Sequence, residues 1–293
     1  MSTIEKANEK LMAASIASQP KPSVDPSQKL VQTEPVDNVT NQANDGYLKT
    51  VEASPPILSL NWEKMRALAF LLPDMGHTLL AEQYRKIKHP LLRKITNNPT
   101  GELKNNLIMI ASALEGEGKS YTAINLAISI AMELDHTALL IDVDSKKSAI
   151  SKSLDITPEL GLSDYLGSAD LEIKDIIYST DIAKLKIIPS GKADLASTEA
   201  ATSTKMKQFL SEISDRYPDR VIILDTPPLM ASAVAKALAF VAGQVVMVVE
   251  AEKTPTTVIE EASQYIENNR FAGFILNKTN LSSSTENLYG NYG

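Results

Sequence analysis

The 293-residue chain contains no cysteine, which excludes disulfide bonds, thiolate metal sites and cysteine nucleophiles. Its three histidines (His77, His89 and His136) lie far apart in sequence, and none has the spacing of a metal-ligand pair. No apolar run reaches the roughly 18 residues that span a bilayer, and the N-terminus lacks the basic and apolar regions of a secretion signal. We therefore expect a soluble, intracellular protein.

An excess of positive charge is also absent. The formal net charge is −7, which argues against nucleic-acid binding through a generally basic surface. The hydrophobic content of 43% is enough for a sizeable core, and the length allows one large domain or two small ones.

What the sequence does contain is a stretch, residues 107–131, that reads LIMIASALEGEGKSYTAINLAISIA. Its first six residues suit a buried strand, a loop with two glycines follows, and apolar residues then recur at helical spacing. A strand, a glycine loop, Lys-Ser and a helix form the context in which a phosphate-binding loop is credible.

The loop meets the pattern G-x-x-x-x-G-K-[ST] with one departure, because its first position is Ala113. Gly116 adds a second flexible point, and the helix after Gly118 directs its positive end toward bound phosphates. Lys119 would reach the β- and γ-phosphates of ATP, and the Ser120 hydroxyl would hold Mg²⁺. The alternative for the loop alone is an ordinary strand–loop–helix turn with a chance lysine.

Strands and helices alternate from residue 106 onward. The expected strands are Leu107–Ala111, Thr137–Asp142, Leu185–Pro189, Arg220–Asp225, Gln244–Glu250 and Ala272–Asn277, and the expected helices lie near Ser120–Leu134, Thr202–Tyr217, Ala233–Val241 and Thr256–Asn268. The strands are nearly continuous in apolar residues, as in parallel strands that helices cover on both faces. This pattern predicts an α/β fold of the P-loop NTPase type. Its doubly wound, mostly parallel sheet would be flanked by helices and would bind ligands beyond the carboxyl ends of the strands.

Acidic residues follow two of these strands. Asp142 and Asp144 leave one strand two residues apart, so they can converge on one cation or divide metal binding and base catalysis between them. Asp225 ends another strand, where a single aspartate is the usual partner of the Mg²⁺ at a phosphate loop. Each acid alone could instead cap a helix or a turn. Three acids at two strand ends, in a chain with a phosphate loop, favour the metal and base roles.

Both ends of the chain are expected to lie outside the folded domain, which we place at residues 61–280. Residues 1–60 should be mostly disordered because 19–56 are polar and proline-rich, with a short helix at 3–16 that either docks on a partner or frays. The tail at 281–293 is polar and should be mobile. A phenol in such a tail is accessible to a kinase, although composition alone favours a terminus whose tyrosines have no role.

Two helices are expected at the start of the folded domain. Residues 61–72 are apolar at helical spacing up to Pro73, and a second helix at 77–95 is interrupted at His89-Pro90.

Three charged residues of the second helix, Glu82, Arg85 and Lys88, lie at i, i+3 and i+6 and should share a broad polar face. That face is either solvated with local ion pairs, the commoner outcome, or part of an interface.

The order of these motifs resembles that of the bacterial tyrosine kinases (BY-kinases). These P-loop enzymes act in exopolysaccharide export and are unrelated to eukaryotic protein kinases. The matching motifs are Ala113-x-x-Gly116-Glu-Gly118-Lys119-Ser120, Asp142-Val-Asp144, Asp225-Thr-Pro-Pro and a tail with Tyr and Gly. The opening MSTIEKANEKL and the stretch from Leu80 to Leu92 resemble the subgroup associated with exosortase (PEP-CTERM) systems. Only residues 19–56 are left unmatched.

The resemblance implies a role for each matching residue. Lys119, Asp142, Asp144 and Asp225 would be catalytic, with Mg²⁺ held by Ser120, Asp142 and Asp225. The nucleotide would contact Ala113, Glu115, Gly116, Glu117, Gly118, Lys119, Ser120 and Tyr121, with Asn277 near the base. Tyr289 and Tyr292 would be the phosphoacceptors, and Glu82, Arg85 and Lys88 would form the oligomer interface.

The resemblance also implies cofactors and partners. ATP and Mg²⁺ would be bound. Because the tail is short and would not easily reach the site of its own subunit, we expect phosphoryl transfer in trans between neighbours in a homo-oligomeric ring. A separate, membrane-anchored polysaccharide chain-length or co-polymerase protein would activate the chain, and a tyrosine phosphatase would reverse its modification. The protein would then be cytoplasmic and peripheral to the inner membrane through that partner.

The chain departs from the family at several positions. Lys146 stands where the family usually has Arg, and Ser148 stands where it usually has Pro. Lys88 replaces the last Arg of the interface motif, and lysine does not form the bidentate contacts of arginine. The tail also has only two tyrosines. These departures bear on self-association and on the extent of autophosphorylation more than on the nucleotide site.

Two other functions fit part of the pattern. A partition- or septum-placing type of ATPase switch shares the fold and the aspartate motifs, but it usually has a second lysine early in the loop, where this chain has Leu114. Such switches also lack a tyrosine tail. A non-catalytic scaffold would bind nucleotide without turning it over, and the intact Lys119, Ser120 and three acids argue against it.

Overall fold

The structure is a computed structural model that describes residues 57–97, 104–192, 203–216 and 219–279. The expected helix at 3–16, the segment 19–56 and the two tail tyrosines lie outside these ranges.

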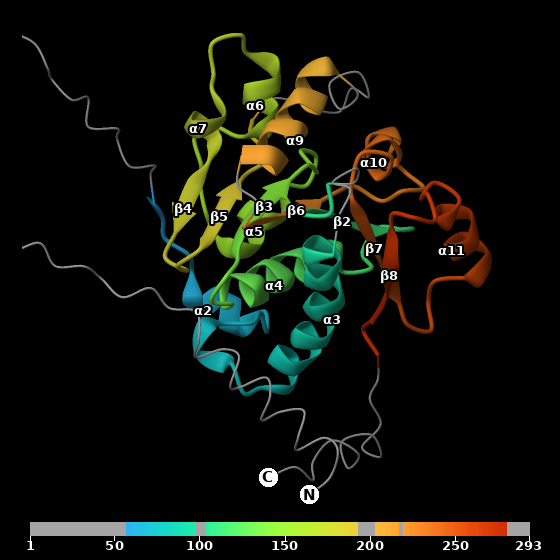
Figure 1. Cartoon of the computed structure of the whole chain (residues 1–293). Helices are drawn as coiled ribbons and strands as arrows, with labels where there is room; N and C mark the ends of the chain where they lie inside the picture. Colours follow the sequence, from blue (N-terminus) through green and yellow to red (C-terminus); the bar gives the residue numbers. More distant parts are fainter. Residues whose placement is uncertain (1–56, 98–103, 193–202, 217–218, 280–293) are drawn as a thin grey trace, which may run out of the picture. The chain divides into compact units, whose positions relative to one another are not determined.

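A single sheet of eight strands organises the described part of the chain (Figure 1). Its order is β1 (Ile57–Leu58), β4 (Tyr178–Thr180), β5 (Leu185–Ile188), β3 (Thr137–Asp142), β6 (Arg220–Asp225), β2 (Leu107–Ser112), β7 (Gln244–Glu250) and β8 (Phe271–Asn277). Neighbouring strands run parallel, apart from the antiparallel pair β4 and β5. The predicted mostly parallel α/β sheet is confirmed, with β1 and β4 as short additional strands that the sequence pattern does not predict.

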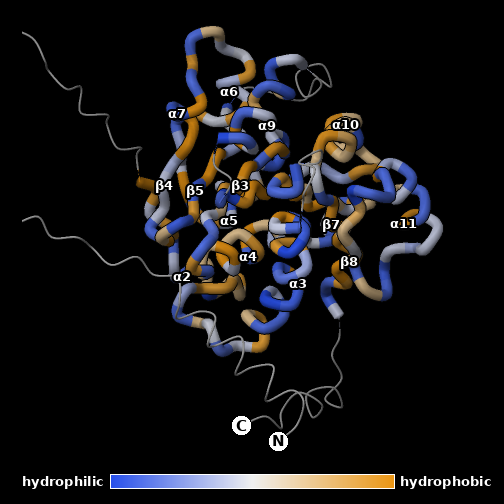
Figure 2. Tube along the Cα trace, in the orientation of Figure 1, coloured by the Kyte–Doolittle hydropathy of each residue, from blue (hydrophilic) through white to orange (hydrophobic). Residues whose placement is uncertain are grey.

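Helices cover both faces of the sheet. They are α2 (Trp62–Ala67), α3 (Leu79–Thr96), α4 (Lys119–Ala131), α5 (Ala149–Leu154), α6 (Leu162–Gly167), α7 (Ile173–Ile176), α9 (Thr204–Arg216), α10 (Ala233–Ala239) and α11 (Thr256–Ser263), with a 3₁₀ turn at Pro73–Met75. Figure 2 shows the central strands as mostly hydrophobic, whereas the helices alternate between hydrophobic and hydrophilic residues. The four helices expected after residue 106 are present, and α5, α6 and α7 were not expected.

Two apolar clusters form the core, one on each face of the sheet. Successive residues of β2 alternate between them, with Ile108 and Ile110 on the side of α2 to α5 and Leu107 and Met109 on the side of α6 to α11. This alternation follows from the two-residue repeat of a strand. Because β2 is buried on both faces, it needs apolar residues at every position, which explains the continuous run in the sequence.

The first helix is shorter than predicted. It ends at Ala67 rather than at Pro73, and Ala69 adopts a left-handed conformation (φ 55°). The three residues from Phe70 to Leu72 follow the helix and are all buried. The Leu71 N–H donates instead to the Asn125 side chain at 2.6 Å.

The predicted interruption at His89-Pro90 is also wrong, because α3 runs through Pro90 without a break. Proline inside a helix removes one hydrogen bond and costs about 3 kcal/mol. Packing of the buried Tyr84 and Leu91 against the core offsets this cost, and the Leu91 carbonyl accepts a hydrogen bond from Gln244 Nε2 at 3.1 Å.

Lys88 does not share the polar face of Glu82 and Arg85, which corrects the expectation from spacing. Glu82 and Arg85 are exposed and form an ion pair with each other, but only 5% of Lys88 is exposed. Lys88 Nζ donates to the Ser129 carbonyl at 2.7 Å and pairs with Glu133 at 2.5 Å. Six helical residues amount to a rotation of 600°, so Lys88 lies about 120° around the helix from Glu82 and faces α4.

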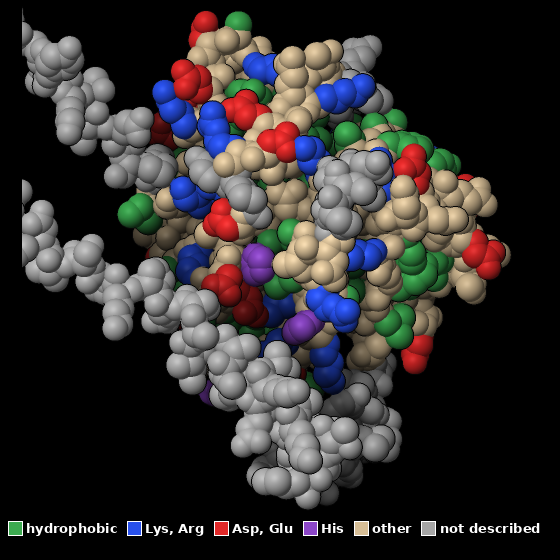
Figure 3. Space-filling view, in the orientation of Figure 1, with side chains coloured by type: hydrophobic (Ala, Val, Ile, Leu, Met, Phe, Trp, Pro, Cys, Tyr) green, Lys and Arg blue, Asp and Glu red, His purple; other side chains and the backbone are tan. Residues whose placement is uncertain are grey.

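The sheet ends at β8, which has a neighbour only on its β7 side among the described strands. Phe274 and Leu276 of this edge strand are exposed. In the part of the chain that the structure describes, no helix combines the length and apolar character needed to cross a membrane. Acidic and basic side chains are interspersed over the face shown in Figure 3.

Candidate functional site

The loop between β2 and α4, residues 113–118, leads directly into the N-terminus of α4. Gly116 and Gly118 have left-handed backbone conformations (φ 85° and 99°), which glycine adopts without strain. A Cβ atom at Gly118 would also lie 2.0 Å from Asn277 Nδ2, so close packing requires glycine there as well. The helix begins at Lys119 with no side-chain cap from Gly118, so its first-turn N–H groups suit an anion.

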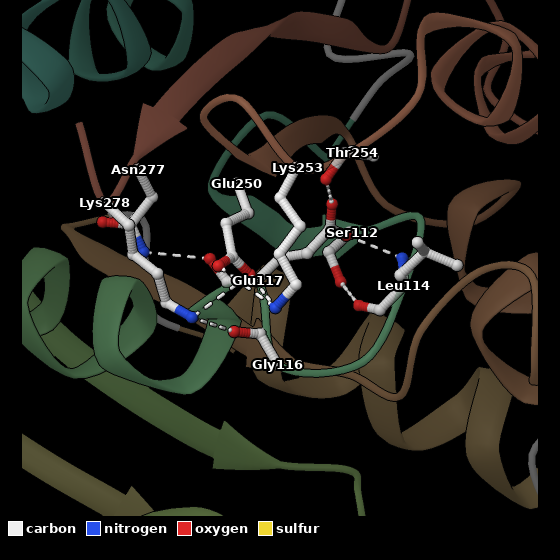
Figure 4. A network of polar contacts seen from close by, with 9 residues as sticks. All are labelled: Ser112, Leu114, Gly116, Glu117, Glu250, Lys253, Thr254, Asn277 and Lys278. Atoms are coloured by element: carbon white, nitrogen blue, oxygen red, sulfur yellow. Dashed lines mark hydrogen bonds and ion pairs between the residues drawn. The ribbon is translucent and has the colours of Figure 1, made fainter. Parts of the chain in front are cut away.

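Side chains hold the carbonyl oxygens of this loop (Figure 4). The Leu114 carbonyl accepts from Ser112 Oγ at 2.6 Å. The next two accept from the end of β8: Gly116 O from Lys278 Nζ at 2.8 Å, and Glu117 O from Asn277 Nδ2 at 2.9 Å.

The backbone N–H groups of the same loop are arranged differently. Within the described ranges, the structure records no protein acceptor for those of Gly116, Glu117 and Gly118. The loop thus turns three of its carbonyl acceptors toward protein side chains and leaves these three N–H donors for a ligand. This is the arrangement that binds phosphate oxygens.

Asp225 lies at the carboxyl end of β6, close to the start of α4. It is fully buried, and neither carboxylate oxygen has a hydrogen-bond partner among the described residues. Burial raises the pKa of Asp225 to about 6, while the neighbouring Ser120 hydroxyl and Lys119 ammonium act in the opposite direction. The Ser120 hydroxyl therefore lies beside the carboxylate without completing a hydrogen bond to it.

Lys119 is the cation of the site. Burial lowers the pKa of its ammonium group, and the negative charges of Asp225 and Asp144 oppose that shift. Lys119 begins α4, and Asp225 ends β6, the strand next to β2. A largely buried ammonium group between carboxylates is ready to pair with an anionic ligand.

Asp142 lies opposite Asp225 in the register of β3 and β6. Its two carboxylate oxygens accept the N–H groups of Asp144 at 3.0 Å and Ile150 at 3.3 Å. Burial, and then the charge of Asp225, raise the pKa of Asp142 well above its usual range. The structure therefore brings Lys119, Asp142, Asp144 and Asp225 together, as the strand-end argument predicts.

The side chains of three other residues predicted to contact the nucleotide point in different directions. Asn277 reaches the loop, as described above. Glu115 is exposed and forms an ion pair with Lys147. The Tyr121 hydroxyl donates to the Ala69 carbonyl at 2.6 Å and its ring stacks on Phe70, so the side chain is directed to the N-terminal segment.

Sequence reasoning missed Ser112, Thr254 and Lys278, which contact the loop from the end of β2, the segment after β7 and the end of β8. Thr254 donates a hydrogen bond to Glu117, whose carboxylate is buried inside the loop. The rule that predicted Asp142 and Asp225 would also have found these residues, since polar side chains just after parallel strands share one edge of the sheet.

Comparison with known proteins connects this geometry to a family. Residues 105–275 match the protein family described as an AAA domain, which covers more than half of the chain. The chain is 35% identical to the tyrosine-protein kinase CpsD of Streptococcus agalactiae over 202 residues, which is 68% of this chain and 86% of the relative.

A longer relative is the succinoglycan biosynthesis transport protein ExoP of Rhizobium meliloti. It is 29% identical over 221 residues, which is 73% of this chain but only 27% of that protein. Among solved structures, the kinase domain of the Escherichia coli tyrosine kinase ETK is similar, with 25% identity and a TM-score of 0.60. That match covers 69% of this chain and 77% of the solved chain. By these similarities, the chain belongs to the bacterial tyrosine-protein kinases of the P-loop type.

Proposed function

We propose that this kinase transfers the γ-phosphoryl group of ATP to Tyr289 and Tyr292 in the tails of neighbouring copies, and thereby regulates exopolysaccharide synthesis or export. The observation that carries the proposal is the juxtaposition of a donor-rich loop with acids on two adjacent strand ends. The loop supplies the phosphate site, and the acids supply the cation site and the base.

The loop and Lys119 would hold the triphosphate. Phosphoryl transfer has a loose transition state, so positioning and charge neutralisation provide most of the acceleration. The N–H groups at 116–118 and the first turn of α4 would bind phosphate oxygens, and Lys119 would neutralise charge that develops on them. Asn277 is positioned by the loop at the end of β8, where we expect it to contact the base.

Ser120 and Asp225 fit a divalent cation. The Asp225 carboxylate is buried without a protein partner among the described residues, and the Ser120 hydroxyl lies beside it. Bound Mg²⁺ would supply neutralisation of phosphate charge. Asp142 already accepts two backbone N–H groups, so we assign it mainly a contribution of negative charge to this cation site.

Asp144 is the acid best placed to accept the tyrosine proton. A free tyrosine has a pKa near 10, so its hydroxyl benefits from a base as the new bond forms. Asp144 is 8% exposed, whereas Asp142 is wholly buried and held by backbone donors. An incoming hydroxyl can therefore reach Asp144, and Asp142 positions the Asp144 backbone.

Transfer between copies requires an assembly. The exposed pair Glu82 and Arg85 on α3 remains our proposed contact, and a head-to-tail contact that closes produces a ring. Each phosphotyrosine adds about −1.5 to −2 charge at neutral pH. On a chain with a net charge of −7, this repulsion would loosen the ring, and a tyrosine phosphatase would restore it.

The similarity to a succinoglycan transport protein supports a role in polysaccharide export. That protein is much longer than the matched region, so we propose that a separate membrane-anchored polysaccharide co-polymerase activates this chain. The kinase would then work in the cytoplasm at the inner membrane, with no nucleic-acid partner.

The test is intact-mass spectrometry with tail peptide mapping after incubation with ATP and Mg²⁺. We expect phosphate on Tyr289 or Tyr292 in the natural chain and none in Lys119→Met. A mixing experiment tests transfer in trans, using Lys119→Met with an intact tail and an active chain that carries Tyr289→Phe and Tyr292→Phe.

Phosphate on the inactive chain in that mixture would support transfer between copies. ATP consumption with an unmodified tail would refute the autokinase proposal and favour an ATPase switch. Binding of ATP without turnover would favour the scaffold.

A further inference from the structure

A buried carboxylate lies inside the phosphate loop itself. Glu117 is only 1% exposed, although it occupies the position just before Gly118. One carboxylate oxygen accepts the Leu114 N–H at 2.6 Å, and the other accepts the Thr254 hydroxyl (Figure 4). A single side chain thus bridges the start of the loop and the segment that follows β7.

A buried carboxylate at this position is unfavourable unless its interactions offset the cost of burial. Burying a carboxylate is costly even when it is hydrogen-bonded, and its negative charge opposes the binding of a triphosphate. Three further acids already lie at the site. A neutral side chain at position 117 would avoid the repulsion, so the benefit has to come from the two hydrogen bonds.

The two bonds hold the loop differently from its other contacts, which are made to its carbonyl oxygens. Asn277 and Lys278 hold carbonyls in the second half of the loop, and both come from the end of β8. Glu117 instead accepts the N–H of Leu114 in the first half of the loop. Its other carboxylate oxygen accepts from Thr254, in the segment after β7 rather than at the end of β8. Thr254 lies in the segment between β7 and α11, just before Pro255, the N-cap residue of α11.

We infer that Glu117 and Thr254 form a latch that holds the phosphate loop in its nucleotide-binding shape before the nucleotide arrives. Both side chains have positioning roles, because they act on the loop backbone rather than on the phosphates. A loop that is already ordered loses less conformational entropy on binding, so the latch should act on nucleotide affinity more than on the chemical step. This inference rests on the proposed nucleotide site.

The first test compares Thr254→Val with Thr254→Ser in the full chain. Valine keeps the shape of threonine without the hydroxyl donor, whereas serine keeps the donor. The probe is a fluorescent ADP analogue with Mg²⁺, and thermal unfolding without nucleotide is measured beside it. We expect the Kd of Thr254→Val to rise about tenfold, the effect of losing a hydrogen bond to a charged group, and that of Thr254→Ser to stay within about twofold.

A second pair of variants tests the carboxylate. Glu117→Gln can keep both contacts, because the amide oxygen accepts from Leu114 and the amide nitrogen donates to Thr254. Glu117→Ala removes both. We expect Glu117→Gln to bind the probe at least as tightly as the natural chain, Glu117→Ala to bind about tenfold more weakly, and Glu117→Ala with Thr254→Val to be no weaker than Glu117→Ala alone.

Several results would overturn the latch. They are unchanged affinity in Thr254→Val, a serine variant as weak as the valine variant, and loss of affinity that is matched by loss of thermal stability without nucleotide. The last result would make the contacts merely structural. In kinetic assays, the KM for ATP should rise while kcat changes less than about twofold, and a fall in kcat alone would also refute the inference. Because the probe is an ADP analogue with no γ-phosphoryl group, its binding tests the latch independently of tyrosine phosphorylation in the tail.

Discussion

Replacing Asp225 with asparagine is expected to stabilise the nucleotide-free protein while it abolishes phosphoryl transfer. In the folded chain, burial raises the pKa of Asp225 from 3.8 to about 6, and neither carboxylate oxygen has a hydrogen-bond partner among the described residues. The ionised form is therefore held in an environment that disfavours it. Asparagine matches the protonated acid in size and polarity and carries no charge at any pH.

The magnitude follows from proton linkage. A group whose folded pKa is raised binds its proton more tightly in the folded state, so the free energy of unfolding falls as pH rises between about 4 and 6 and is level above that. A difference of about two pH units corresponds to about 3 kcal/mol. The natural chain and Asp225→Asn should be equally stable near pH 4, and the variant should be more stable by about 3 kcal/mol at pH 7.5.

Thermal unfolding without nucleotide, at several pH values from 4 to 8, measures this difference. For a domain of this size, the unfolding midpoint of Asp225→Asn should exceed that of the natural chain by about 6–12 °C at pH 7.5. Asp135→Asn is the matched control, because it removes one exposed carboxylate and should change little. A less stable variant at pH 7.5, or a difference that is the same at every pH, would refute the reasoning.

Two further predictions concern residues away from the acids. Lys88→Met should lower the free energy of unfolding in urea by about 2 kcal/mol, because it removes a buried pair of contacts to Ser129 and Glu133, and unchanged stability would contradict the helix-anchoring role. Gly118→Ala should weaken binding of the ADP probe more than tenfold, because a Cβ there meets Asn277, whereas Gly116→Ala should weaken it about fivefold through backbone strain alone. Equal losses in the two glycine variants would contradict this account.

The sheet and most of the site could be predicted from sequence because both depend on strand ends. Continuous apolar runs indicate the buried parallel strands, and Asp142 and Asp225 are the acids that end two of them, whereas Asn277 was predicted only from the resemblance to the family. The predicted helix interruption at Pro90 was wrong because packing outweighs the unfavourable effect of proline inside a helix, and Leu91, the next residue, is buried in the core. The prediction that Lys88 shares a face with Glu82 and Arg85 was wrong because a spacing of three residues does not keep every third residue on one helical face.

The contacts made by Glu117 and Tyr121 could not be predicted from the motif. The pattern places both near a nucleotide, but it does not say whether a side chain points toward the ligand or toward the protein. Glu117 turns to Thr254, which is 137 residues away in sequence, and Tyr121 turns to Ala69. Such pairings depend on which segments the sheet brings together, and a single sequence carries no record of them.

The order of the sheet has a consequence for biosynthesis. β2 lies between β6 and β7, and Asn277 holds Glu117 across 160 residues of chain. During translation, β2 and the loop leave the ribosome long before β6 and β7. The apolar strand β2 is therefore exposed until its two neighbours have been made. The contacts from Asn277 and Lys278 to the phosphate loop can form only after the end of β8 has been made.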